Sequence, residues 1–182
     1  WYSQQITHRL GKEKFADYVK RFQYGNADVS GDPGKNNGLE RAWIASSLKI
    51  SPMEEAGFLS RLLNGTLPIS PEATAKTIAL VETLPDKTNG WTIQGKTVAA
   101  FPRRADGSFD QAKSWGWYVG WAEKDGRRLV FARLIQDEKI ENPTAGGRAR
   151  DSLVKDLPGI LKEWQQLPSI IPSGRPNTAV CS

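Results

Sequence analysis

The sequence contains a single cysteine, Cys181, and a single histidine, His8, near opposite ends of its 182 residues. One cysteine excludes an internal disulfide and a cysteine-based metal site. We do not expect these two residues to form a catalytic Cys–His pair. No apolar run approaches the length that spans a membrane, and no charged segment followed by an apolar one marks a signal peptide. The first residue is Trp1 rather than Met, so we expect either processing or a piece of a longer chain.

The charge of the chain is moderately basic. Its 25 Lys and Arg residues exceed its 20 Asp and Glu residues, which gives a net charge of +5. The basic residues are interleaved with acids, so solubility explains them as well as nucleic acid would. Because no RNP-like, helix-turn-helix or zinc-finger pattern is present, nucleic acid is not an expected partner. With 38% hydrophobic and 25% charged residues, the chain is expected to form one globular domain with a real core.

The first half of the sequence has the pattern of helices. Residues 3–22 predict two helical segments that are broken near Gly11. Residues 24–43, rich in Gly, Asn and Asp, predict a long loop. A capping-box pattern opens a helix over 51–64, and a second Ser-Pro-Glu start opens another over 70–83.

The second half changes to the pattern of strands. Three strands are predicted, followed by an amphipathic helix with a proline that we expect to kink or break it; these are residues 91–101, 115–124, 127–138 and the helix 147–164 with Pro158. Asp125-Gly126 is a two-residue hairpin signal. The order predicts an α+β or mixed α/β fold over residues 1–167, with a flexible tail over 168–182.

Within the first predicted strand, Lys96 and Thr97 stand next to each other. An ammonium group supplies charge and a neighbouring hydroxyl supplies a directed hydrogen bond, so such a pair can bind a carboxylate. Taken alone, the pair is equally compatible with an ordinary strand that carries a solvated lysine. The surrounding motifs decide between the two interpretations.

Five motifs occur in one order along the chain. They are Tyr24-Gly25-Asn26, Trp43 with Leu48-Lys49-Ile50-Ser51-Pro52, Gly95-Lys96-Thr97, Trp117-Tyr118-Val119-Gly120-Trp121, and Arg148 after Gly146-Gly147. In this order the chain resembles the C-terminal part of a class D, oxacillinase-type, serine β-lactamase. The resemblance implies a β-lactamase/transpeptidase-like fold, incomplete here, with a helical region, three antiparallel strands and a C-terminal helix.

The resemblance also implies a function: binding of penicillins and hydrolysis of the β-lactam amide through an acyl-serine. It implies substrate-binding roles for Lys96, Thr97, Val98 and Arg148, an oxyanion-hole N–H at Ala99, supporting roles for Trp43 and Ile44, and scaffold roles for Tyr24 and Asn26. The Trp43 indole would hydrogen-bond a carboxylated lysine. No metal is implied, and the CO₂-derived carbamate would lie on a segment absent from this sequence. A periplasmic location and a role in antibiotic resistance are implied as well, without a membrane partner, while the oligomeric state is left open.

Two departures from the family pattern affect the expected activity. The S-x-x-K nucleophile motif and the S-x-V motif are expected before Trp1, together with two strands and the nucleophile helix. The strings Ser46-Ser47-Leu48-Lys49 and Ser152-Leu153-Val154-Lys155 fit S-x-x-K, but the serine must stand on the first turn of a helix. Ser46 precedes the predicted helix cap, and Ser152 is expected to face water inside a helix. We interpret both strings as coincidences.

Val98 replaces the glycine of the K-T-G motif. Because side chains alternate along a strand, Val98 and Lys96 are expected on one face, where valine would crowd a ligand. The chain alone is therefore expected to be inactive. The alternative is a non-hydrolytic penicillin-binding or sensor-like module. An unpaired strand edge also predicts marginal stability or aggregation of the isolated chain.

Overall fold

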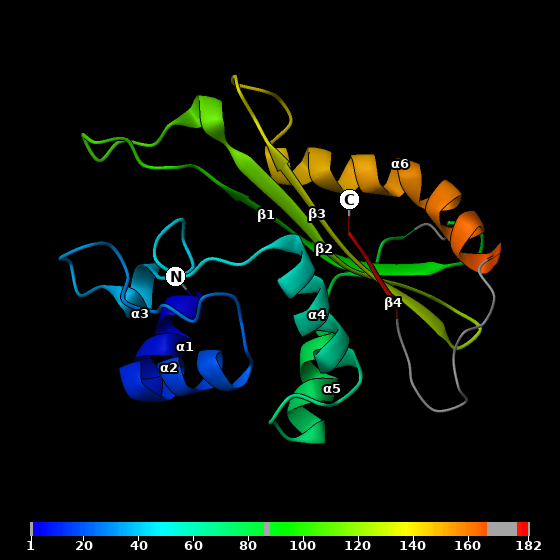
Figure 1. Ribbon diagram of the computed structural model, residues 1–182, viewed down its shortest axis with the longest axis horizontal. Helices are drawn as coiled ribbons and strands as arrows, with labels where there is room; N and C mark the ends of the chain where they lie inside the picture. The colour runs from blue at the N-terminus through cyan, green and yellow to red at the C-terminus, as the bar shows by residue number, and fades with distance from the viewer. Residues whose placement is uncertain (1, 86–87, 167–177, 182) are drawn as a thin grey trace.

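A computed structural model describes residues 2–85, 88–166 and 178–181 of the chain. A helical lobe comes first and is followed by a sheet that carries helices on both faces (Figure 1). The elements are α1 Tyr2–Leu10, α2 Lys12–Arg21, α3 Gly38–Arg41, α4 Pro52–Leu63, α5 Pro71–Ala79, β1 Thr92–Ala100, a 3₁₀ turn Gln111–Lys113, β2 Trp115–Lys124, β3 Arg127–Gln136, α6 Ala145–Gln166 and β4 Thr178–Cys181. The α+β prediction is confirmed.

The lobe of α1, α2 and α3 has its own small core. Gly11 separates α1 from α2 at φ 82°, which explains the predicted break. Val19, Val29 and Ala42 are buried together, and Phe15 packs edge-on against Trp43 with ring centroids 5.8 Å apart. This packing fixes the end of the long loop, where Trp43 follows α3.

Helix α4 joins the lobe to the sheet, and it begins as predicted. The Ser51 hydroxyl accepts the Glu54 N–H, and the Glu54 carboxylate accepts the Ser51 N–H, which forms a complete capping box. Buried side chains of α4 pack against one face of the sheet; the cluster comprises Ala56, Leu59, Leu62, Leu67, Trp121, Val130 and Ala132. The cap therefore sets where a sheet-covering helix starts.

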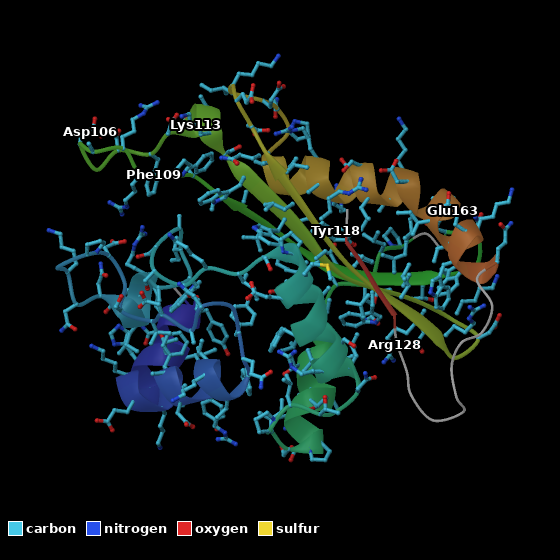
Figure 2. All side chains as sticks on the ribbon, in the orientation of Figure 1. Asp106, Phe109, Lys113, Tyr118, Arg128 and Glu163 are labelled. Atoms are coloured by element: carbon cyan, nitrogen blue, oxygen red, sulfur yellow. The ribbon has the colours of Figure 1, made fainter. Side chains whose placement is uncertain are left out.

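The sheet has the order β1-β2-β3-β4, with β1, β2 and β3 antiparallel and β4 parallel to β3. Helix α6 covers the face opposite α4. Figure 2 shows Tyr118 between the sheet and α6, where it stacks on Phe131 among buried leucines of α6. The three predicted antiparallel strands are confirmed.

Three local expectations need correction. Helix α6 does not break at Pro158, because Leu157 and Leu161 on either side are buried and proline removes only one helical N–H bond, while a kink there stays a prediction. The loop 24–43 contains α3, a single turn too short to produce a hydrophobic period. In the predicted tail, Thr178–Cys181 form β4, while 168–177 and 182 lie outside the described residues.

Candidate functional site

The outer edge of β1 is the first element of the site. The Ile93 carbonyl accepts the Leu84 N–H at 2.9 Å, and the Gly95 N–H donates to the Glu82 carbonyl at 3.0 Å. These groups point away from β2. Backbone groups alternate in direction along a strand, so the N–H and C=O of Thr97 and Ala99 point to the same outer side. Among the described residues, no backbone group pairs with that edge beyond Gly95.

The side chains of this stretch divide between the two faces of the sheet. Lys96 lies opposite Val119, and Val98 lies opposite Trp117, on the face that α4 covers. Thr97 lies opposite Tyr118, on the face that α6 covers. Val98 is 49% exposed, and Lys96 is exposed beside it. The prediction that Lys96 and Val98 share a face is confirmed.

Lys96 reaches the outer edge itself. Its ammonium group donates to the Thr97 carbonyl oxygen at 2.9 Å. That carbonyl belongs to the edge that also carries the Ala99 N–H. The edge therefore presents an ammonium group and an unpaired N–H within a stretch of four residues.

Arg148 stands near the start of α6, where Gly146 lets the helix approach β1. A Cβ on Gly146 would lie only 2.6 Å from the Val98 carbonyl oxygen. The Arg148 Nη2 donates to the two Asp137 carboxylate oxygens at 2.5 and 2.6 Å, and its Nε donates to the Pro143 carbonyl at 3.0 Å. The expected substrate-binding arginine is thus held by an internal carboxylate.

Asp137 and Ser114 are site residues that the sequence reasoning missed. The Ser114 hydroxyl donates to the Asp137 carboxylate, and the Asp137 N–H donates to the Ser114 carbonyl at 2.8 Å. The Arg148 hydrogen bonds, followed by that of Ser114, hold the pKa of the Asp137 carboxyl below its ordinary value. A signal existed, because a two-residue turn at Asp125-Gly126 places Ser114 opposite Asp137 in a regular hairpin.

The helical lobe carries the other expected site residues. Trp43 and Ile44 are half-buried in the turns after α3, and the Ile44 N–H donates to the Arg41 carbonyl at 2.8 Å. Within the described ranges, no hydrogen bond or ring contact joins either residue to β1. The structure therefore does not bring these two together with Lys96, Thr97 and Ala99.

Asn26 links two segments of the lobe. Its amide group donates to the Ser47 carbonyl at 2.9 Å and accepts the Lys49 N–H at 3.0 Å, while its own N–H donates to the Lys49 carbonyl at 2.9 Å. Gly25 has φ 54°, and a Cβ there would lie 1.9 Å from the Lys49 oxygen. These contacts explain a Tyr-Gly-Asn sequence by backbone geometry, in keeping with the expected scaffold role.

Tyr24 contacts a buried acid that the sequence reasoning also missed. Its ring packs edge-on against Phe58 with centroids 4.9 Å apart, and its hydroxyl hydrogen-bonds Glu55. Burial, then the charge of Glu55 and this hydrogen bond, raise the pKa of Tyr24 above its ordinary value. Burial also raises the pKa of Glu55, whose Oε2 has no hydrogen-bond partner within residues 2–85, 88–166 and 178–181.

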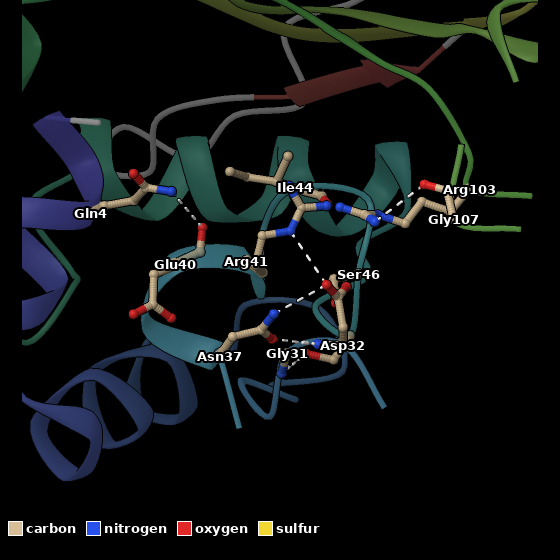
Figure 3. Close-up of polar contacts among 11 residues, drawn as sticks. Gln4, Gly31, Asp32, Asn37, Glu40, Arg41, Ile44, Ser46, Arg103 and Gly107 are labelled. Atoms are coloured by element: carbon tan, nitrogen blue, oxygen red, sulfur yellow. Dashed lines mark hydrogen bonds and ion pairs between the residues drawn. The ribbon is translucent and has the colours of Figure 1, made fainter. Parts of the chain in front are cut away.

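Neither S-x-x-K string has its serine on the first turn of a helix. Ser46 lies in a bend and donates to Asp32 at 2.8 Å, within the network of Figure 3 that also binds Asn37 and Arg41. Ser152 lies beyond the first turn of α6 and donates to the Ala149 carbonyl at 3.0 Å. The expectation that Ser152 faces water is wrong, because it is half-buried and accepts from Arg133 at 3.2 Å.

Residues 2–85, 88–166 and 178–181 contain neither a metal-binding cluster nor a membrane-spanning helix. In that part of the chain, no group of three His, Cys, Asp or Glu side chains could hold a metal ion. The helices described there include none both long and apolar enough to cross a membrane.

Known proteins resemble this chain over most of its length. The family model described as penicillin binding protein transpeptidase domain matches residues 1–159. β-Lactamase OXA-9 of Klebsiella pneumoniae is 45% identical over 162 residues, which are 88% of this chain and 58% of that protein. β-Lactamase OXA-1 of Escherichia coli is 37% identical over 158 residues, which are 86% of this chain and 55% of that protein.

One solved structure is similar at the level of the fold as well. The crystal structure of OXA-427 class D β-lactamase aligns with a TM-score of 0.80 at 44% identity, covering 90% of this chain and 66% of that chain. This chain spans less than three fifths of the length of the two curated relatives.

Proposed function

Because the chain belongs to the penicillin-binding protein transpeptidase domain family, in its class D β-lactamase branch, we propose that it supplies the substrate-binding part of a serine β-lactamase. The reaction is hydrolysis of the β-lactam amide through an acyl-serine. The observation that carries the proposal is the open edge of β1, where the Ala99 N–H points outward beside the Lys96 ammonium.

The proposed roles follow from the direction of each group. The Ala99 N–H donates to the β-lactam carbonyl oxygen as negative charge develops on it, which stabilises the oxyanion. Thr97 and Arg148 reach the ligand from the α6 side of the edge, and Lys96 reaches it from the α4 side. Together they bind the ligand carboxylate, for which charge-assisted hydrogen bonds are well suited.

The acyl-transfer step needs a serine that this chain does not offer. Both candidate hydroxyls, those of Ser46 and Ser152, are already committed to internal hydrogen bonds. We assign the nucleophile, and the carboxylated lysine that would contact Trp43, to sequence outside these 182 residues. The chain alone then binds penicillins without hydrolysing them, and export to the periplasm belongs to the complete protein.

Two measurements test the proposal. Benzylpenicillin titrated into the ¹⁵N-labelled chain should shift the backbone amide signals of Thr97 and Ala99, and the absence of any shift there would reject the edge as a ligand site. Intact mass after incubation with benzylpenicillin should stay at 20.2 kDa. An adduct that maps to Ser46 or Ser152 would contradict the assignment of the nucleophile to other sequence.

A second candidate is a non-hydrolytic penicillin-binding module. The internal hydrogen bonds of both serine hydroxyls favour it for this chain by itself. Restoring the missing sequence separates the two functions. The complete protein should hydrolyse benzylpenicillin if it is a β-lactamase. A non-hydrolytic penicillin-binding module would bind benzylpenicillin without turnover.

A further inference from the structure

Ser114 and Asp137 face each other where the β2–β3 ladder ends. The last pair of the ladder is Trp115 with Gln136, so the next residue on each strand forms the terminal pair. Two hydrogen bonds join them: the Asp137 N–H to the Ser114 carbonyl at 2.8 Å, and the Ser114 hydroxyl to the Asp137 carboxylate. Both residues are buried. The sheet therefore holds the Asp137 carboxylate in one position.

That carboxylate holds Arg148 in turn. The Nη2 group contacts both Asp137 oxygens, and Nε contacts the Pro143 carbonyl oxygen at 3.0 Å. Among the described residues, Nη1 has no hydrogen-bond partner. The Arg148 side chain is 28% exposed, whereas that of Asp137 is 5% exposed. The guanidinium is thus oriented with a single amino group left for a ligand.

We propose that Asp137, held by Ser114, is a positioning residue that fixes Arg148 for recognition of a ligand carboxylate. This inference rests on the proposed function, because it deepens the role of the same arginine. A flexible arginine loses rotamer freedom on binding, and pre-orientation removes part of that loss. Asp137 acts through Arg148 and does not itself contact the ligand.

Two effects of Asp137 oppose each other, and their sizes decide the expected sign. Its negative charge weakens the attraction between Arg148 and an incoming anion. This Coulomb effect is small at a partly exposed group, because water and salt screen it. Hydrogen bonds weaken steeply when they are misaligned, so the loss of orientation dominates. Removing Asp137 should therefore weaken carboxylate recognition.

The test compares benzylpenicillin with benzylpenicillin methyl ester, which differ only in the carboxylate. Binding of each is followed through the Ala99 amide signal in the parent chain, Asp137→Asn and Ser114→Ala. We expect the parent to prefer the acid, and Asp137→Asn to lose about tenfold of that preference, the size of one charged hydrogen bond. Ser114→Ala should lose a smaller part, because it keeps the Asp137 charge.

Asp156→Asn is the matched control. It removes the carboxylate of another Arg–Asp pair, in which Asp156 of α6 accepts from Arg133 of β3 at 2.7 Å. Its preference for the acid should equal that of the parent. The Arg148 Nε–H signal provides a second readout, which should be sharp in the parent and in Asp156→Asn and broadened in Asp137→Asn.

The outcomes distinguish failure of the Asp137 positioning role from failure of the proposed carboxylate site. Unchanged or increased preference for the acid in Asp137→Asn would overturn the positioning role alone. Equal binding of acid and ester by the parent chain would reject the carboxylate site of the proposed function, and the positioning role with it. Should Asp137→Asn fail to fold, Ser114→Ala decides, since a preference equal to that of the parent would also overturn the inference.

Discussion

Glu55 is a buried acid in the first turns of α4, beside the Tyr24 hydroxyl. It is 7% exposed, and one of its carboxylate oxygens has no hydrogen-bond partner in the part of the chain that the structure describes. A buried carboxyl of this kind is more stable with its proton, because its charge is poorly solvated. The proton that it keeps makes the stability of the chain depend on pH.

Replacing Glu55 by glutamine should remove this pH dependence. Burial raises the pKa of Glu55, so the folded chain keeps the proton at pH values where the unfolded chain has released it. The contribution to stability is complete below the unfolded pKa, which is about 4.3, and is lost as pH rises through the folded pKa. The free energy of unfolding of the parent should thus fall relative to Glu55→Gln from pH 4 toward neutrality, in urea titrations.

The exposed Glu72, paired with Lys76 on α5, provides the control. Glu72→Gln makes the same substitution at a solvent-exposed carboxyl, so it reports any general effect of replacing Glu by Gln. A difference between the parent and Glu55→Gln that stays constant with pH would show that Glu55 does not keep its proton in the folded chain.

Tyr118 is a second buried polar residue, whose side chain carries a neutral hydroxyl. It is 1% exposed, burial raises its pKa to about 12, and its oxygen has no hydrogen-bond partner among the described residues. Tyr118→Phe should therefore raise the free energy of unfolding by up to about 1–3 kcal/mol, the cost of an unsatisfied buried group. Urea midpoints measure this, and a less stable variant would reveal a partner for the hydroxyl.

At the scale of elements, the helix starts and strand faces were predictable because their signals are local. Ser51 and Glu54 indicate the start of α4 within four residues. Lys96 and Val98 share a face because side chains alternate along a strand. Pro158 does not break the helix, because burial of neighbouring leucines outweighs a local preference. Pairing of Arg148 with Asp137, or of Tyr24 with Glu55, joins residues that do not share a helix or strand, and it leaves no local pattern.

The Ser51 cap should contribute measurably to stability. Ser51→Ala removes the acceptor for the Glu54 N–H and should lower the free energy of unfolding by about 1 kcal/mol. Ser60→Ala, inside the same helix, should change it much less. Chemical denaturation of both variants makes the comparison, and equal losses would show that the capping hydrogen bond is not the cause.

Val98 tests the ligand side of strand β1. Val98→Gly removes a 49% exposed branched side chain beside the open edge. If Val98 keeps the ligand from apolar contacts equivalent to one or two methyl groups, its removal should increase benzylpenicillin affinity about tenfold. The Ala99 amide titration measures the affinity. Val98→Ala should fall between the two, and an affinity that does not follow side-chain size would exclude crowding.

At the scale of the whole molecule, the described part of the sheet ends in an open edge that borders an apolar row. Val98, Trp117 and Leu134 lie side by side across three strands, and Val98 and Leu134 are 49% and 37% exposed. An open edge next to apolar side chains favours pairing between copies. We expect the chain to associate as its concentration rises.

Sedimentation velocity over a concentration series tests this expectation. Val98→Lys should reduce association, because a lysine on an edge strand opposes pairing. Ile6→Lys is the control, since Ile6 is 50% exposed but lies on α1, which contacts α2 and α3 rather than the sheet. Equal effects of the two substitutions would point to general hydrophobicity rather than to the β1 edge.

The alternation along β1 has a consequence for how the strand can change. Ile93 and Gly95 are tied to the 82–84 segment, so their spacing to Ala99 decides which way the Ala99 N–H points. One residue inserted after Gly95 would turn Lys96 toward α6 and aim the Ala99 amide into β2. A substitution in β1 keeps this alternation, whereas an insertion or deletion of one residue reverses it. Strand β1 should therefore tolerate a changed residue far better than a changed length.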